Sequence, residues 1–230
     1  MAKNQWDKYA RIFDDGIGEG NEELHQNHID PVIFDYLDGN KYGTILDAGC
    51  GNGYLLNRLS RFSNLLIGLD YSKELLHFAK SRTSGNDKVK LILADLMKKI
   101  PLEDSSVNVV IANMVLQYLP SLNVFAAESH RILKDKGFLI VIVDHPGHQL
   151  FARAQELAGK SDPHFMETGS YFESGLRSKN SLWNKAVLEY YHRPLNGYID
   201  PFLKYFRLTK IDEKTQNGEV PRLLALKFVK

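Results

Sequence analysis

Short apolar runs alternate with amphipathic segments along residues 40–145 of the chain. The apolar runs are 44–50, 65–71, 89–96, 107–115 and 138–145, and helical periodicity marks 54–62, 72–83 and 124–134 between them. Strands that alternate with helices of about ten residues form βαβ units, in which a parallel sheet lies between two layers of helices. The runs are apolar throughout because both faces of such a sheet are covered. The pattern predicts an α/β fold.

The two ends of the chain lie outside this alternation. Spaced aromatic residues predict a short amphipathic helix within residues 1–20, and residues 21–38 form a second helical stretch with Pro31 in its first turn. Residues 207–216 and 222–230 are predicted to close the chain as two strands joined through the Asn217–Gly218 turn signal. Within the alternating region, we expect the helix that begins near 124 to stop at Lys136–Gly137, where glycine supplies the C-terminal turn.

The periodicity weakens after Pro146. Residues 149–160 predict a short helix, 187–193 a strand, and Pro194 opens a helix over 195–206. The polar stretch 159–186 between them is too long for a structureless loop in a compact domain. We therefore predict a single domain over residues 1–230, with residues 1–40 as an N-terminal helical lid and residues 148–194 as an inserted cap over the cleft.

A glycine-rich turn, DAGCGNG, follows the first predicted strand and holds Gly49, Gly51 and Gly53. A dinucleotide fingerprint has the spacing G-x-G-x-x-G, because the pyrophosphate approaches the helix that follows. Tyr54 stands at the last position of that spacing, and the lysine and hydroxyl of a phosphate-binding loop are missing. The turn therefore argues against a nicotinamide-dependent oxidoreductase and against a phosphoryl donor.

Three carboxylates stand at the ends of successive predicted strands, namely Asp47, Asp70 and Asp95. In a doubly wound sheet these strand ends meet at the carboxyl edge, where ligands bind. A carboxylate after the second strand can accept hydrogen bonds from both hydroxyls of a ribose, and one after the third can accept from an adenine amino group. The three acids beside a glycine turn favour a ligand that carries no phosphate and has a positive charge.

The chain resembles the Rossmann-like (class I) S-adenosylmethionine-dependent methyltransferases of small-molecule type. The resemblance rests on LDAGCGNG (46–53), LIGLDYS (66–72), LILADL (91–96), SSVNVVIANMVLQYL (105–119) and HRILKDKGFLIVIV (130–143), in the family's order over residues 40–145. It implies a three-layer α/β/α sandwich with a mostly parallel seven-stranded sheet and an antiparallel C-terminal strand.

The resemblance also implies a cofactor, S-adenosyl-L-methionine, and residues that bind it. Asp47 and the loop Gly49–Gly53, with Cys50 and Gly51, would hold the methionine end, and Asp70 the ribose. Tyr71 would pack on the adenine, while Asp95 and Leu96 would contact its edge. Asn113 would face the methionine portion, and Tyr9 or Phe13 would close over the cofactor. Cys50 is best interpreted as a small packing residue, because a buried thiol beside a turn is usually inert.

On the acceptor side, Gln117 and Tyr118 occupy a stretch where the family often has a histidine, and we predict that they contact substrate. His145 directly follows the fifth strand and His192 stands beside Arg193. Histidine suits a general base because its charge changes near neutrality, although a lone histidine is more often structural. An alcohol or phenol as acceptor would need such a base, and His145 is the first candidate, with His192 as the second. Arg193 could clamp a carboxylate or phosphate, or equally form a surface ion pair or cap the next helix.

These residues predict transfer of a methyl group to an O or N atom of a small-molecule acceptor. The alternatives are a tRNA or protein methyltransferase and a non-catalytic cofactor-binding protein of the same fold. A net charge of +1 without a basic run gives no reason to expect a nucleic-acid partner.

Bulk properties bound the cellular setting. The single cysteine and the absence of metal-ligand spacing predict neither a disulfide nor a metal site. No secretory signal and no apolar run of about 18 residues is present, so a soluble, cytoplasmic monomer or homodimer without a membrane partner is the expectation.

Overall fold

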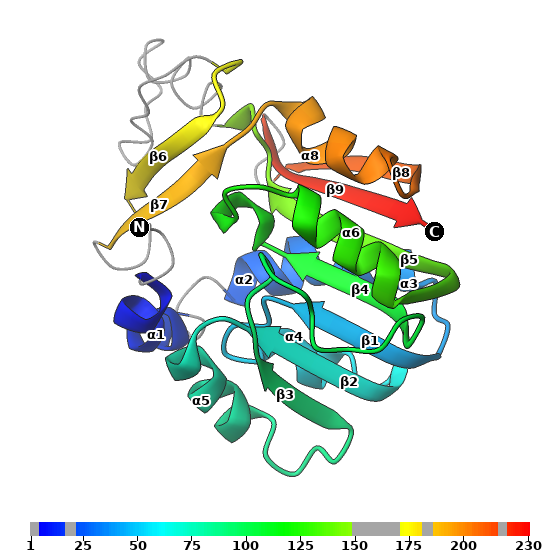
Figure 1. The fold of residues 1–230 in the computed structure, drawn as a ribbon. Coiled ribbons are helices and arrows are strands. Elements are labelled where there is room, and N and C mark those ends of the chain that lie inside the picture. Colours follow the sequence, from blue (N-terminus) through cyan, green and yellow to red (C-terminus); the bar gives the residue numbers. More distant parts are fainter. Residues whose placement is uncertain (1–4, 17–21, 149–170, 181–185, 216–219) are drawn as a thin grey trace.

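The computed structural model describes residues 5–16, 22–148, 171–180, 186–215 and 220–230. A seven-stranded sheet runs through its centre in the order β3-β2-β1-β4-β5-β9-β8 (Figure 1). Its strands are β1 (Tyr42–Ala48), β2 (Ser63–Asp70), β3 (Val89–Leu93), β4 (Val107–Asn113), β5 (Leu133–Asp144), β8 (Arg207–Thr215) and β9 (Pro221–Val229). β9 runs antiparallel to both of its neighbours, β5 and β8, and the other pairs of strands in this sheet are parallel. The predicted fold class is confirmed.

Helices cover both faces of the sheet. On one face lie α3 (Asp30–Leu37), α4 (Tyr54–Arg58) and α5 (Lys73–Arg82), and on the other α6 (Asn123–Ile132) and α8 (Leu195–Leu203). The strands present apolar side chains to both layers, for example Ile45 to the first and Leu46 to the second. Packing of each strand between these two cores fixes its position in the sheet. The loops that follow the strands at the carboxyl edge are positioned in consequence.

Local signals explain where two of these helices begin or end. Ser72 caps α5, since its hydroxyl oxygen accepts a hydrogen bond from the Leu75 amide. The predicted end of α6 at Lys136–Gly137 is wrong, because the helix ends at Ile132 and Leu133 already has extended backbone. Gly137 instead lies inside β5, where an added Cβ would come within 2.9 Å of the Asn108 carbonyl oxygen. Close backbone approach therefore explains that glycine.

The cap region contains a second, two-stranded sheet, in which β6 (Gly175–Asn180) pairs antiparallel with β7 (Val187–His192). The strand predicted over 187–193 is thus present, but it lies outside the main sheet. The helix predicted over 149–160 and the turn at Asn217–Gly218 lie outside the described residues. The proposed cap boundaries at 148 and 194 stay a prediction.

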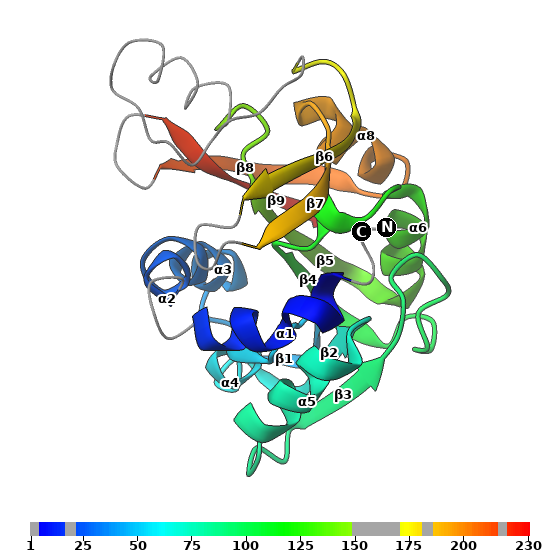
Figure 2. The same ribbon diagram turned by 90° about the vertical axis from the view of Figure 1, so that its left-hand side faces the viewer.

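The N-terminal forty residues divide into two parts. Helix α3 packs in the core, while α1 (Gln5–Gly16) lies across the sheet edge where β1 and β2 end (Figure 2). The short α2 (Glu22–Leu24) and the π-helical turn η3 (His25–Ile29) connect to α3. Movement of the whole segment 1–40 as a lid stays a prediction. None of the helices in the described ranges is long and apolar enough to cross a membrane.

Candidate functional site

The glycine loop, residues Gly49–Gly53, follows β1 at the carboxyl edge of the sheet. Gly49, Gly51 and Gly53 have φ angles of 84°, 53° and 77°, a region that side chains with a Cβ disfavour. A Cβ at Gly49 would also lie 2.5 Å from Val115 Cγ2. The amides of Gly49 and Cys50 both donate to the Leu69 carbonyl, at 2.7 and 3.0 Å. The loop is therefore pinned to the end of β2, and its residues Cys50 to Gly53 are buried.

Asp70 ends β2 beside this loop. Its two carboxylate oxygens accept hydrogen bonds from the amides of Gly51 and Ser72, each at 2.8 Å. Burial raises the pKa of Asp70, and these amides oppose that rise. The Tyr71 amide also hydrogen-bonds to this carboxylate, and binding of the ribose hydroxyls by Asp70 stays a prediction.

Asp47 and Asn113 stand at the ends of the neighbouring strands β1 and β4. Asp47 is 2% exposed, and burial, together with the charge of Asp70, raises its pKa to about 8. Asn113 Oδ1 is buried without a hydrogen-bond partner in the described part of the chain. A buried acceptor and a buried acid both require a donor or a positive charge. The ammonium and sulfonium groups of S-adenosylmethionine fit that requirement.

The residues predicted to hold an adenine lie at the same edge. Tyr71 is nearly half exposed, and Asp95 follows β3 by two residues, with Oδ1 accepting from the Met97 amide at 2.9 Å. Leu96 and Cys50 are buried, and burial raises the pKa of the Cys50 thiol, as expected for an inert packing residue. The adenine contacts stay a prediction.

Helix α1 lies against the glycine loop and α5. Asp14 Oδ1 accepts hydrogen bonds from Asn52 Nδ2 at 2.7 Å and Arg82 Nη2 at 2.6 Å, and Asp7 Oδ1 accepts from the Ser72 hydroxyl at 2.6 Å. A Cβ on Gly51 would be 3.4 Å from the Phe13 ring. Tyr9, half-buried, lies on the same helix. These contacts place α1 over the loop, whereas closure of Tyr9 or Phe13 on a cofactor stays a prediction.

The other end of α1 is joined to the cap. Gln5 Nε2 donates to the Glu189 carbonyl, and the Glu189 amide donates to Gln5 Oε1, both at 2.9 Å. The Trp6 ring packs edge-on against Tyr118, with centroids 4.7 Å apart. Helix α1 therefore bridges the glycine loop and the β6–β7 sheet, and no sequence motif signalled this bridge.

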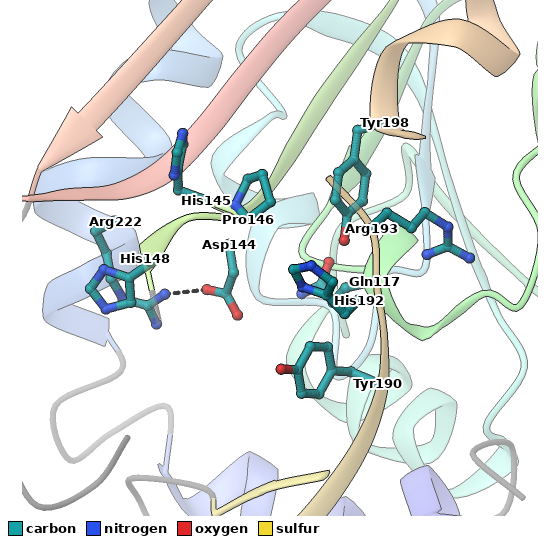
Figure 3. Close-up of a pocket in the computed structure, with 10 residues that line it drawn as sticks. All are labelled: Gln117, Asp144, His145, Pro146, His148, Tyr190, His192, Arg193, Tyr198 and Arg222. Carbon is teal, nitrogen blue, oxygen red and sulfur yellow. Dashed lines mark hydrogen bonds and ion pairs between the residues drawn. The ribbon is translucent and has the colours of Figure 1, made fainter. Parts of the chain in front are cut away.

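A pocket of about 410 Å³, including space continuous with solvent, lies beyond the loop. We call it the edge pocket; its lining is Gln117, Asp144, His145, Pro146, His148, Tyr190, His192, Arg193, Tyr198 and Arg222. Figure 3 shows Asp144 between Arg222 and His148 on one side and Tyr190 and His192 on the other. Gln117 is 2% exposed; its side-chain amide interacts with the Tyr118 hydroxyl, and its Oε1 has no hydrogen-bond partner among the described residues.

The structure brings four predicted acceptor-side residues to this pocket, namely His145, His192, Arg193 and Gln117. His145 Nδ1 accepts from the Gly147 amide at 3.1 Å, so Nε2 carries the hydrogen that faces Glu213 Oε1 at 2.7 Å. Both ring nitrogens are engaged, which gives no support to His145 as a base. His192 Nε2 lies 2.8 Å from the Tyr171 carbonyl and therefore carries its hydrogen.

Arg193 is buried and bonded to main-chain carbonyls. Its guanidinium donates to the carbonyls of Leu116, Leu119 and Tyr191. These contacts hold the turn η4 (Leu116–Tyr118), on which Gln117 and Tyr118 lie. The geometry supports a positioning role, and neither a surface ion pair nor a substrate clamp is needed to explain this arginine.

Sequence reasoning missed Asp144, Lys179 and Arg222. Asp144 Oδ2 lies 2.6 Å from Lys179 Nζ, and Oδ1 is bonded to Arg222 Nη1. Burial alone would raise the pKa of Asp144, but the two cations outweigh it and hold the pKa well below its usual range. Asp144 is the last residue of a strand at the carboxyl edge, like Asp47 and Asp70, and that position was the available signal. Lys179 and Arg222 carry no motif.

Comparisons with known proteins agree with this geometry. Residues 46–141 match the family model described as a methyltransferase domain. A malonyl-[acyl-carrier protein] O-methyltransferase of Hamiltonella defensa is 32% identical over 100 residues, 44% of this chain and 37% of that protein. A demethylmenaquinone methyltransferase of Staphylococcus aureus is also 32% identical over 100 residues, 42% of this chain and 41% of that protein. The chain thus matches about two fifths of the length of these curated relatives.

The likeness of the fold extends further than the sequence match. The crystal structure of a protein from Listeria monocytogenes, described as an S-adenosylmethionine-dependent methyltransferase, superposes with a TM-score of 0.67. It is 23% identical, and the superposition covers 86% of this chain and 96% of that one. The superposition therefore extends well beyond residues 46–141.

Proposed function

We propose that this chain, whose residues 46–141 belong to the class I S-adenosylmethionine-dependent methyltransferases, moves a methyl group to an O or N atom of a small-molecule acceptor. The observation that carries the proposal is the adjacency of two unsatisfied sites. Asn113 Oδ1 lies at the cofactor edge and Gln117 Oε1 in the edge pocket, and both oxygens are buried without partners among the described residues. Asn113 ends β4 and Gln117 lies on the turn η4 that follows, so a donor and an acceptor molecule would meet there.

S-adenosylmethionine supplies, when bound, a methyl group on a positively charged sulfur, which is already an electrophile. The glycine loop, Asp47 and Asn113 would hold its amino-acid end, Asp70 the ribose, and Tyr71, Asp95 and Leu96 the adenine. The residues of the edge pocket would then align the acceptor atom with the methyl group. Alignment of two reactants can supply most of the rate in such a transfer.

We propose His192, which lines the edge pocket and whose Nε2 is held by the Tyr171 carbonyl, as the base for an acceptor that must lose a proton. His145 is proposed instead to hold the turn after β5 through Gly147 and Glu213. Replacing each histidine by Gln and recording rate against pH separates the roles, since only loss of the base removes the acidic limb of the profile.

Calorimetric titration tests the proposal directly. The protein is expected to bind S-adenosylmethionine and S-adenosylhomocysteine and not NADH, and Asp70→Asn is expected to weaken both by at least about tenfold through lost ribose contacts. Binding of NADH alone would refute the proposal.

A screen of small acceptors, read by formation of S-adenosylhomocysteine, then tests turnover. Methylation of tRNA or protein in place of every small molecule would favour the alternative substrate class. Cofactor binding without transfer to any acceptor would indicate a non-catalytic protein of this fold.

A further inference from the structure

A cation cluster of Arg222, Lys179 and Asp144 stands at the edge pocket; Arg222 and Asp144 line the pocket, and Lys179 is paired with Asp144 beside it. Arg222 and Lys179 share the single carboxylate of Asp144, and the three side chains are 13%, 19% and 19% exposed. Asp144 is ionised because its pKa is lowered by both cations, which outweigh the effect of burial. Among the described residues the cluster therefore carries one surplus positive charge.

The neighbouring titratable groups do not neutralise that charge. Burial, followed by the charge of Arg222, lowers the pKa of His148 to about 4, and burial raises the pKa of Tyr118, so both are uncharged near neutrality. Glu213 is paired with His145 and its side chain is 58% exposed. Arg193 adds a further cation to the lining, although main-chain carbonyls surround it.

The two cations also retain unused hydrogen-bond donors. A guanidinium offers five N–H groups and an ammonium three. In the described part of the chain Arg222 donates a hydrogen bond to Asp144, and Lys179 donates one to Asp144 and lies over the Tyr190 ring. Gln117, which also lines the pocket, has a side-chain N–H group of its own. The side chains of Arg222 and Lys179 are 13% and 19% exposed, so their remaining donors are open to a ligand.

We propose that the methyl acceptor carries an anionic group, a carboxylate or a phosphate, which binds at Arg222 and Lys179 with Gln117 donating to the same molecule. This inference rests on the proposed function and names its substrate class. Asp144 serves as the internal counter-ion, which holds the two cations in place and limits the affinity for the acceptor. The pocket would thus select a small acid over its neutral analogue.

Three probes of similar shape test the selection, namely benzoate, phenyl phosphate and benzamide. Calorimetry is carried out with the full chain, first without and then with saturating S-adenosylhomocysteine. At least one of the two anions is expected to bind ten or more times more tightly than benzamide. A tenfold ratio of dissociation constants corresponds to a difference of about 1.4 kcal/mol in binding free energy. Equal affinity for benzamide, or no binding of either anion, would overturn the inference. The stronger anion identifies carboxylate or phosphate as the group.

Two substitutions at the cluster act in opposite directions. Arg222→Met is expected to weaken the anion at least about tenfold, while Asp144→Asn is expected to strengthen it several-fold, because it removes the competing carboxylate. Lys210→Met, which removes an exposed lysine of β8, is the matched control. Circular dichroism and S-adenosylhomocysteine affinity verify the fold of each variant. A purely structural cluster would leave anion affinity unchanged in both variants, and that result also overturns the inference.

The two proposals fail in different ways. If S-adenosylhomocysteine binds but the anions show no preference, the acceptor class is wrong and the proposed function stands. If the anions bind as expected but neither S-adenosylmethionine nor its product binds, the proposed function fails and the anion site stands.

Discussion

Asp47→Asn should make the ligand-free protein more stable at alkaline pH. Burial and the nearby Asp70 raise the pKa of Asp47 from 3.8 to about 8. A group with a raised pKa keeps its proton in the folded state while the unfolded chain has lost it, so its contribution to stability is present below pH 3.8 and is lost as pH rises to about 8. A difference of one pKa unit between the folded and unfolded states corresponds to about 1.4 kcal/mol, so the stability lost over the whole pH range is on the order of 5 kcal/mol.

Urea unfolding of the ligand-free protein between about pH 5 and about pH 9 measures this loss. The wild-type free energy of unfolding should fall with pH by several kcal/mol relative to Asp47→Asn, which cannot ionise at this position. Asp87→Asn, at an exposed carboxylate, should reproduce the wild-type curve. Parallel curves for wild type and Asp47→Asn would refute the reasoning, because the buried carboxyl would then carry no cost of ionisation.

The same substitution should weaken the cofactor. A positively charged ligand beside Asp47 restores the favourable ionised form, so binding below about pH 8 should release a proton. Asp47→Asn should therefore gain stability and lose affinity for S-adenosylmethionine, both measurable on one preparation. If Asp47→Asn raised both the stability and the affinity for S-adenosylmethionine, the positive end of the ligand would not lie beside Asp47.

Three further substitutions test other parts of the site. Gly49→Ala should destabilise the fold by about 1–3 kcal/mol and abolish cofactor binding. Adding Val115→Ala should relieve only the steric clash, because the backbone φ of 84° stays strained. Urea unfolding measures the stability and calorimetry the binding, and full recovery of both in the double variant would contradict this. Gln5→Ala removes two hydrogen bonds between α1 and Glu189 and should therefore speed release of S-adenosylhomocysteine several-fold in stopped-flow experiments. Lys8→Ala, at an exposed residue of the same helix, is the control. An unchanged release rate would show that α1 does not restrain the ligand. Arg193→Lys should lower the free energy of unfolding by about 2–4 kcal/mol, since an ammonium group cannot reach the carbonyls of Leu116, Leu119 and Tyr191 together. A thermal midpoint equal to that of the wild type would refute the positioning role of Arg193.

The fold was predictable because its signals are local and repeated. Each buried strand is an apolar run, and Ser72, Pro31 and Pro194 mark the starts of helices as expected. The end of α6 was not predictable in the same way. Gly137 is a helix stop by local rules, but the backbone of β4 requires its small size inside a strand.

The two halves of the site differ in the same respect. The cofactor side consists of strand ends and one contiguous loop, so the sheet topology brings Asp47, Asp70 and Asn113 together. The acceptor side joins β5, β6 and β9, with partners 35 and 78 residues apart in the chain. No periodicity or motif encodes such pairs, and the cation cluster therefore became visible only in three dimensions.

The contact between Gln5 and Glu189 involves only main-chain atoms of β7. The Gln5 side-chain amide pairs with the backbone N–H and C=O of residue 189 as a neighbouring strand would, so the contact does not depend on the side chain at that position. The inward residues Tyr190 and His192 can therefore be exchanged during evolution or by design while α1 keeps its hold on the hairpin. This arrangement separates the attachment of the β6–β7 sheet to α1 from the identity of the side chains that line the edge pocket.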